Sequence, residues 1–310
     1  MRANLPSQFH RDGFAVINRL IGASEIEFLR EIGHRLLSSR TGYAQGMMFD
    51  FYPESDGCNS APQLLQLHWA SYFERRLSKL RVRRHAFDIA KALLGPDVRF
   101  AGDSFFLKQS HTHTLTPWHQ DDAFTDARID HREVNFWIPL QAVSVDNGCM
   151  QFIPGSHLYD VLPHTPLGGD VTAHGLECVG EFDRTCAVPC PLMPGDCTVH
   201  AGRTLHAAGP NRSNEPRYAY ALNFRLPRRR SNSVVNFPWH NTWQPLRISR
   251  SRVSWSLRGY WPYLQREMYT FDFRNPFEWQ LTGRRVARRL CTWQRQIPES
   301  KPEGATGSDT

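Results

Sequence analysis

The sequence predicts a mainly β domain, a sandwich or barrel of short strands, with helices flanking it. From Val98 to Leu226, short aromatic and β-branched runs are separated by Gly, Pro, Asn and Asp, which is typical of closely spaced strands joined by turns. Helical periodicity is confined to the residues before Pro96. Hydrophobic residues make up 40% of the 310 residues, which supplies a sizeable core and excludes a wholly disordered chain.

The first 95 residues are predicted to form a strand and two helical regions. Asp12-Gly13 is a turn signal, and the apolar run Phe14–Ile17 after it predicts a short strand. Ser24 and Glu27 have the spacing of a capping box, and apolar residues continue at helical spacing behind them. We therefore expect a helix that starts after Ser24 and ends near residue 38.

A loop and the second helical region are expected next. Residues 41–60 are rich in Gly, Ser, Asp and Pro, and predict a loop that folds over a site. Residues 70–94 carry apolar side chains at helical spacing, and Gly95-Pro96 ends that pattern.

Residues 96–227 are predicted to be the β core that carries the functional site. The expected strands are Phe105–Leu107, Val134–Leu140, Met150–Ile153, Thr198–Val199 and Tyr218–Leu226. Residues 228–310 are an extension rich in Arg and Trp, and its end, Pro298–Thr310, is expected to be a frayed tail. Together with residues 1–95, these parts are predicted to make one domain over residues 1–310.

The sequence gives no signal for a membrane or for export. The residues after Met1 include a charge but not the apolar segment of a signal peptide, and no run approaches the roughly 18 apolar residues that span a bilayer. The seven cysteines are odd in number and lack a regular disulfide spacing. We therefore expect a cytoplasmic protein with reduced thiols.

The string Trp118–Asp122 is the most informative motif. Side chains alternate faces along a strand, so a strand here points His119 and Asp121 to the same side. An imidazole and a carboxylate two residues apart are able to bind one metal ion. With a second histidine from a distant strand they form the two-histidine, one-carboxylate set of non-haem Fe(II) sites, which leaves positions open on the iron.

Several histidines are candidates for that third ligand. They are His157, His164, His174, His200 and His206. Residues 193–213 favour the last of them, because a Pro-Gly-Asp turn leads into a strand and small residues follow His206, leaving room around a metal. Arg217 stands eleven residues later on the next expected strand, where its planar guanidinium suits a carboxylate.

Together with further strings, these residues resemble the phytanoyl-CoA dioxygenase (PhyH) family of Fe(II)/2-oxoglutarate-dependent oxygenases. The further strings are Phe9–Phe14 (FHRDGF), Asn135–Leu140 (NFWIPL) and Asp146–His157 (DNGCMQFIPGSH). The resemblance covers roughly residues 7–226, with the motifs in the family's order. It implies a double-stranded β-helix, or jelly roll, of the cupin-like kind with helices packed on its outside.

The resemblance also implies the roles of individual residues. His119, Asp121 and His206 match the iron ligands, and Arg217 matches the anchor for 2-oxoglutarate. Thr116 and Trp137 stand where family members often contact this co-substrate.

The activity implied by the resemblance is a dioxygenase reaction. With Fe(II) and O2, oxidative decarboxylation of 2-oxoglutarate to succinate and CO2 supports hydroxylation or desaturation of an unactivated C–H bond. Related halogenases carry a small residue in place of the carboxylate, so Asp121 favours oxidation over halogenation. The implied substrate is a small organic molecule, with secondary metabolism as one setting, and a CoA- or carrier-bound acyl thioester is the alternative.

Two other classes of protein fit the same three ligands. One is a non-catalytic, metal-binding, cupin-like protein, and the other is a zinc hydrolase with a metal-bound water. An arginine placed for a carboxylate argues against the first, because holding a metal alone needs no such anchor.

The formal net charge of +7 raises the question of other partners. Clusters at Arg228–Arg230 and Arg284–Arg289 permit nucleic-acid binding, but a solvated or subunit-facing surface is the favoured interpretation. Nucleic-acid demethylases with the same triad place a second arginine six residues after the anchor, where this chain has Asn223. We expect neither a nucleic-acid nor a membrane partner. The C-terminal tryptophans are expected to cap the barrel mouth or to join a homodimer; they are Trp239, Trp243, Trp255 and Trp261.

Overall fold

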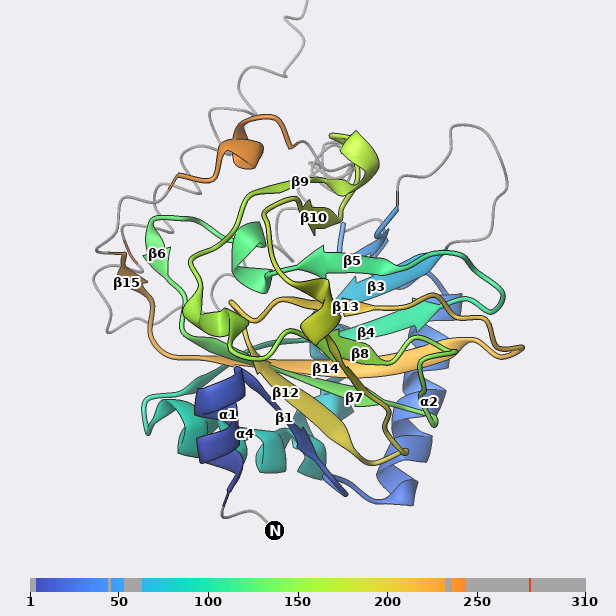
Figure 1. The fold of residues 1–310 in the computed structure, drawn as a ribbon. Helices are drawn as coiled ribbons and strands as arrows, with labels where there is room; N and C mark the ends of the chain where they lie inside the picture. Colours follow the sequence, from blue (N-terminus) through green and yellow to red (C-terminus); the bar gives the residue numbers. More distant parts are fainter. Residues whose placement is uncertain (1–3, 44–45, 53–62, 232–235, 244–278, 280–310) are drawn as a thin grey trace, which may run out of the picture. The chain divides into compact units, whose positions relative to one another are not determined.

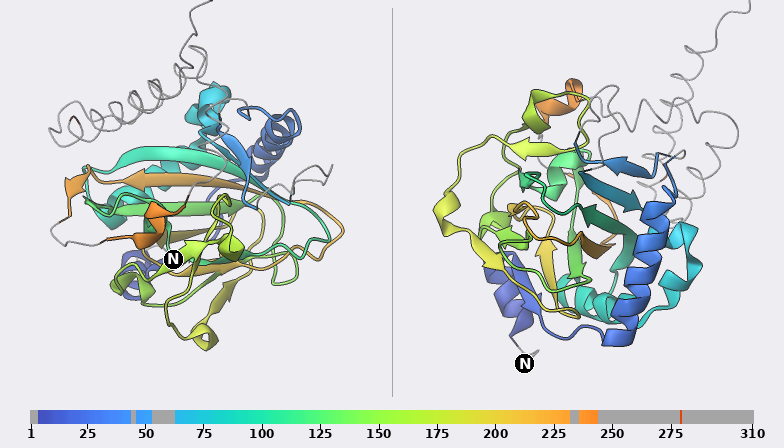
Figure 2. Two further views of the ribbon diagram at one scale, coloured as in Figure 1. Left: turned by 90° about the horizontal axis from the view of Figure 1, so that it is seen from above. Right: turned by 90° about the vertical axis from the view of Figure 1, so that its right-hand side faces the viewer.

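Two antiparallel sheets form the centre of the described chain (Figures 1 and 2). The computed structural model describes residues 4–43, 46–52, 63–231, 236–243 and 279. All of these except Trp279 fall in one compact unit, residues 1–270. Most of residues 228–310 are not among the described residues, and the single domain expected from the sequence stays a prediction.

The larger sheet has seven strands in the order β1-β12-β7-β14-β4-β3-β2. Every neighbouring pair in it is antiparallel. The strands are β1 (Phe14–Ile17), β2 (Met48–Asp50), β3 (Leu64–His68), β4 (Arg99–Lys108), β7 (Glu133–Pro139), β12 (Cys197–Ala201) and β14 (Arg217–Arg225).

The smaller sheet has four strands in the order β11-β8-β13-β5, and it faces the larger one. Its strands are β5 (Thr116–His119), β8 (Met150–Phe152), β11 (Val188–Cys190) and β13 (His206–Ala208). The rings of Phe14 on β1 and Phe152 on β8 stack between the sheets with centroids 4.6 Å apart. Two further pairs of short strands complete the β structure: β6 (Ile129–Asp130) with β15 (Arg229–Arg230), and β9 (His164–Pro166) with β10 (Leu176–Cys178).

Most of the described helices precede the core strands or lie in the connections between them, and one 3-10 helix follows the last described strand. The α-helices are α1 (Leu5–Asp12), α2 (Ala23–Ser38), α3 (Ala70–Phe73) and α4 (Arg81–Leu94). The 3-10 helices are η1 (Arg75–Lys79), η2 (Asp121–Phe124), η3 (Ser156–Leu158), η4 (Leu167–Gly169), η5 (Arg184–Cys186) and η6 (Pro238–Asn241). Among the described helices, none has the length and hydropathy needed to cross a membrane.

The two faces of the larger sheet differ in chemistry. On the outward face, aromatic and aliphatic side chains such as Phe105, Tyr220 and Leu222 pack with the apolar sides of α2 and α4 in the main core. The alternate residues turn inward toward the smaller sheet, and they include polar and charged groups. The outward face therefore supplies stability, and the inward face is left for the functional site.

The predicted fold class is confirmed: a mainly β chain with flanking helices and a double-stranded β-helix core. The five strands expected between residues 105 and 226 correspond to β4, β7, β8, β12 and β14. The expected strand Phe14–Ile17 is β1, and the helix end near residue 38 is also observed.

The expected N-cap of the first long helix is wrong, because Gly22 and not Ser24 caps α2. The backbone N–H groups of Glu25 and Ile26 donate to the carbonyl of Gly22, so α2 begins at Ala23 and Ser24 lies inside the helix, where it is not a cap. In the first turn of α2, the Glu25 side chain accepts a hydrogen bond from the backbone N–H of Val82, 3.1 Å away.

Three other local features differ from the expectations or add to them. The expected helical region 70–94 consists of three helices, two short and one longer (α4), because the chain is extended at Glu74 and at Leu80. The segment 41–60, expected to be a loop, contains the strand β2, while its residues 53–60 are not among the described residues. The helix α1 has no counterpart among the expectations; it ends at Asp12 and is capped by Gly13, whose φ of 81° suits glycine.

Leu29 is fully buried on α2, so replacing it tests how much the outward-face core contributes to the stability of the fold. We expect Leu29→Ala to lower the free energy of unfolding by about 2–5 kcal/mol, because it removes buried methyl groups and leaves a cavity. Leu158→Ala is the matched control, since that side chain is 75% exposed, and it should change stability by less than about 0.5 kcal/mol. Denaturant titration measures both, and equal effects would contradict this account of the core.

Candidate metal centre

The first two triad residues lie on either side of the point where β5 ends. His119 is the last residue of β5, Gln120 is extended, and Asp121 opens η2. The expectation that His119 and Asp121 share one strand is therefore wrong, although the extended Gln120 between them still turns both toward the same side. The buried Gln120 amide fixes this corner by donating to the carbonyl of Arg203 and accepting from the N–H of Leu162, both at 2.8 Å.

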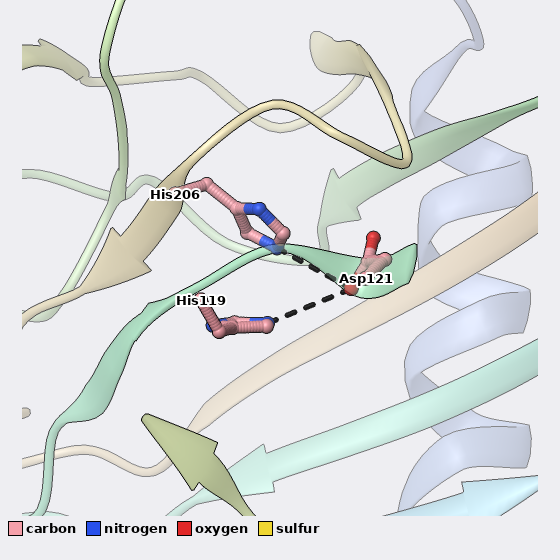
Figure 3. A group of neighbouring side chains, drawn as sticks. All are labelled: His119, Asp121 and His206. Atoms are coloured by element: carbon pink, nitrogen blue, oxygen red, sulfur yellow. Dashed lines mark ion pairs between the residues drawn. The ribbon is translucent and has the colours of Figure 1, made fainter. Parts of the chain in front are cut away.

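The third residue reaches the same place through strand pairing. His206 opens β13, and its backbone is the direct partner of His119 on β5. The Asp121 Oδ1 atom lies 3.5 Å from His119 Nε2 and 3.6 Å from His206 Nε2 (Figure 3). Ligand atoms of the three side chains all lie within 4.8 Å of one another, which is the spacing of a metal site.

Backbone carbonyls orient both triad imidazoles. His119 Nδ1 is 2.7 Å from the carbonyl of Pro117, and His206 Nδ1 is 2.8 Å from the carbonyl of Thr204. A carbonyl accepts only, so each Nδ1 carries the proton and donates. Each Nε2 is then left with its lone pair directed at the space beside Asp121, which is the state in which histidine binds a metal.

The electrostatics favour the ligand forms of these groups. Burial lowers the pKa of His206 well below its usual value, and nearby His119 lowers it further, so its imidazole is neutral. Enclosure would raise the pKa of Asp121, yet this pKa is held well below its usual value, with the hydrogen bond from His200 contributing, so the side chain is a carboxylate. Two imidazoles that direct Nε2 toward one carboxylate fit a divalent iron.

A cavity of about 540 Å³ opens beside the triad, between the two sheets. This volume is typical of small-molecule sites. Aromatic groups line much of its wall, namely Phe49, Phe51, Phe106, Phe124, Trp137 and Trp243. Polar side chains of the larger sheet provide hydrogen-bonding groups, namely Gln66, His68, Ser104, Glu133, Asn135 and Asn223.

One end of the cavity carries the buried guanidinium of Arg217, with a second basic side chain beside it. Arg217 and Lys108 are direct partners across β14 and β4, and both side chains are buried. Arg217 Nη1 donates to the carbonyl of Gly148 at 2.9 Å, and its guanidinium lies over the Trp137 ring, 5.1 Å from the centroid. Arg217 Nε has no hydrogen-bond partner among the described residues.

Lys108 shares this end but does not line the cavity. Its ammonium donates to the carbonyls of Gly209 at 2.7 Å and Ala208 at 3.4 Å, and lies 3.5 Å from the hydroxyl of Thr116. Burial and then the charge of Arg217 lower the pKa of Lys108 well below its usual value, and burial lowers that of Arg217 to about 10. No carboxylate pairs with either cation within the described part of the chain. This end therefore favours an anionic ligand.

The remaining histidine candidates are not brought into the triad. His157 lies near the N-terminal helix, 3.2 Å from the carbonyl of His10. His164 accepts from the N–H of Gln120, and burial lowers its pKa to about 4. His174 stacks on Phe49 in the cavity wall.

Two residues at the site, Lys108 and Asn135, received no role in the sequence analysis. His200 was a ligand candidate, and a hydrogen bond from it to a ligand was weighed but not favoured, yet His200 and Asn135 both contact Asp121. Their signal is a polar residue at an inward position of an otherwise apolar strand. Of the C-terminal tryptophans, Trp243 lines the cavity and Trp239 is buried, while Trp255 and Trp261 lie outside the description.

Two facing antiparallel sheets with an Asp and two His side chains at the cavity between them define the class of double-stranded β-helix proteins with a two-histidine, one-carboxylate site. The comparison with family models agrees: phytanoyl-CoA dioxygenase (PhyH) matches residues 9–219. The chain belongs to the phytanoyl-CoA dioxygenase family.

Individual relatives cover different shares of the chain. Phytanoyl-CoA dioxygenase domain-containing protein 1 of Bos taurus is 31% identical over 121 residues, 38% of this chain and 42% of that protein. Dioxygenase andF of Emericella variicolor is 30% identical over 148 residues, 44% of this chain and 45% of that enzyme. The chain thus spans less than half the length of these two curated relatives.

A solved structure matches over a larger share. EvdO2 from Micromonospora carbonacea var. aurantiaca, complexed with 2-oxoglutarate, is 29% identical with a TM-score of 0.66. The match covers 77% of this chain and 96% of EvdO2.

The geometry of the triad predicts the effect of removing one ligand. We expect His206→Ala to weaken Fe(II) or Mn(II) binding at least about 100-fold, because one of three converging ligand atoms is lost. His157→Ala is the control and should bind metal as the wild type does, since that imidazole lies elsewhere. Anaerobic calorimetric titration measures both, and unchanged binding by His206→Ala would refute the assignment.

Proposed function

We propose that this protein is an Fe(II)- and 2-oxoglutarate-dependent dioxygenase that hydroxylates or desaturates an unactivated C–H bond of a small organic molecule. The observation that carries the proposal is the pairing of two features in one cavity. The triad of two histidines and one carboxylate lies beside it, and a buried arginine that no described carboxylate neutralises lies at one end. A ligand that chelates a metal through one end and carries a carboxylate at the other suits both features.

In this proposal, residues of the chain hold and orient the reactants. His119, Asp121 and His206 hold the metal through two Nε2 atoms and one carboxylate oxygen. Arg217 pairs with the distal carboxylate of 2-oxoglutarate, since its Nε and its remaining Nη protons are the donors available at that end. Iron with 2-oxoglutarate and O2 supplies the oxidising power, through decarboxylation to succinate and CO2.

Two neighbours of Arg217 shape its end of the cavity. Trp137 packs against the guanidinium and limits its movement, and the Thr116 hydroxyl lies beside the Lys108 ammonium. Thr116 and Trp137 both line the cavity, so each is placed to contact the co-substrate.

The cavity also bears on the substrate class. Its aromatic wall excludes water and packs against an apolar molecule, while the amide, hydroxyl and carboxyl groups orient polar substituents. We propose a small molecule of secondary metabolism as the substrate. The fungal dioxygenase and the 2-oxoglutarate complex of EvdO2 support this class of reaction. Cytoplasmic location and a homodimer stay predictions, as does the acyl thioester alternative.

The buried arginine argues against the other two classes. A cupin-like protein that holds a metal, or a zinc hydrolase with its metal-bound water, has no use for an unneutralised guanidinium at the far end of the cavity, yet its burial costs free energy. A site for a second carboxylate explains that cost.

Succinate formation under air tests the function and the anchor together. We expect the wild type with Fe(II) to convert 2-oxoglutarate to succinate, and Arg217→Ala to raise the KM for 2-oxoglutarate about 10- to 100-fold, the value of a charge-assisted pair. The exposed arginine in Arg184→Ala is the control and should leave KM unchanged.

Replacing Fe(II) by Zn(II) in the same assay separates the classes further. Succinate with iron and none with zinc is expected, because zinc has no redox chemistry. Absence of succinate in every metal state, or an unchanged KM for Arg217→Ala, would overturn the corresponding part of the proposal.

A further inference from the structure

A polar row crosses three neighbouring strands on the inward face of the larger sheet. In the register of the sheet, Asn223 on β14 is opposite Asn135 on β7, and Asn135 is in turn opposite His200 on β12. Asn135 and His200 are buried, and their neighbours in sequence, such as Phe136 and Val199, point outward into the main core. Such adjacent polar positions in a buried sheet need hydrogen-bond partners to be tolerated.

The row ends on the carboxylate of Asp121. Asn135 Nδ2 donates to Asp121 Oδ2 at 2.5 Å, and His200 Nε2 lies 3.2 Å from the same oxygen. Asn223 Nδ2 donates to Asn135 Oδ1. Because the oxygen of Asn135 is occupied by Asn223, its amide nitrogen is the group that faces Asp121.

The two oxygens of Asp121 therefore have different surroundings. Oδ1 faces the Nε2 atoms of His119 and His206, while Oδ2 is held by His200 and Asn135. A carboxylate that is free to rotate is able to present both oxygens to a metal and take one more coordination position. Two donors on Oδ2 oppose that rotation.

The environment of His200 indicates that its Nε2 atom, rather than its ring as a whole, explains a histidine at this position. Its ring lies against Phe152 and His206, with centroids 5.3 Å and 4.4 Å away, so an aromatic ring without nitrogen would also fill the space. Its Nδ1 atom is buried without a hydrogen-bond partner among the described residues, which is unfavourable. A histidine here is explained by the bond that Nε2 donates to Asp121.

We propose that His200 and Asn135, with Asn223 behind them, are positioning residues that hold Asp121 so that it presents one oxygen to the metal. This inference rests on the proposed function, since it assigns the triad to a divalent metal. These residues touch neither the metal nor the substrate in the proposed reaction; they act through Asp121. The row thereby keeps open the coordination positions that 2-oxoglutarate and O2 require.

Two substitutions at position 200 separate positioning from packing. His200→Phe keeps a ring and removes the donor, whereas His200→Gln removes the ring and keeps an amide N–H near the place of Nε2. If His200 positions Asp121, we expect His200→Phe to weaken Co(II) binding about 10- to 100-fold and His200→Gln to stay within about threefold of the wild type. If the ring serves packing alone, the order of the two variants reverses, and the proposal is overturned.

The measurement is anaerobic titration of the full-length protein with Co(II), followed by absorption spectroscopy, which needs no substrate and no turnover. Asn135→Ala is expected to weaken binding as His200→Phe does, and both are expected to change the cobalt spectrum, which depends on coordination number. Thr198→Val is the matched control: Thr198 is buried two residues before His200 on β12, and its hydroxyl has no partner within the described residues. This control should bind Co(II) with the wild-type affinity and spectrum.

The remaining outcomes separate this inference from the proposed function. Wild-type affinity and spectrum in both His200→Phe and Asn135→Ala, with succinate formation intact in the wild type, would overturn the positioning role and leave the dioxygenase proposal standing. A wild type that binds no Co(II) at the triad would overturn both.

Discussion

The pairing of β13 with β5 is the constraint on which the site depends. It places His206 directly opposite His119, although 86 residues separate them in the chain, and the corner at Gln120 brings Asp121 to the same point. Carbonyls of Pro117 and Thr204 then fix both imidazoles with their lone pairs directed inward. Lone pairs of these three side chains converge on one small space, where they repel one another. A bound cation would remove that repulsion, so the arrangement fits a metal site.

The cationic end of the cavity is the second constraint. Its charge is positive, whereas the metal centre carries the negative charge of Asp121. Arg217 and Lys108 are buried side by side, and the lowered pKa of each reflects the cost of that burial. Backbone carbonyls accept some of their hydrogen bonds, but carbonyls carry no net charge and do not neutralise these basic side chains. A dicarboxylate would link the two ends of the cavity, because its charges complement a cation at each end. The outward face of the same sheet, packed with aliphatic and aromatic groups, supplies stability to offset these costs.

Local sequence signals predicted much of this arrangement. Short aromatic and β-branched runs predicted β4, β7, β8, β12 and β14. The motif around His119 and the segment around His206 pointed to the three residues that the structure brings together. The capping box at Ser24 failed because a backbone carbonyl, that of Gly22, already receives the first N–H groups of α2. The contacts of His200 and Asn135 with Asp121 were not predicted, because they depend on cross-strand register, which joins residues 65 positions apart, and a polar residue in an apolar strand does not by itself show its partner.

A crystal structure of the protein with Mn(II) and 2-oxoglutarate, obtained without O2, would test the central claim most directly. The account predicts the metal bonded to Nε2 of His119, Nε2 of His206 and one oxygen of Asp121, with the distal carboxylate of 2-oxoglutarate on Arg217. A metal bound away from these three side chains, or a co-substrate that leaves Arg217 without a carboxylate partner, would contradict it.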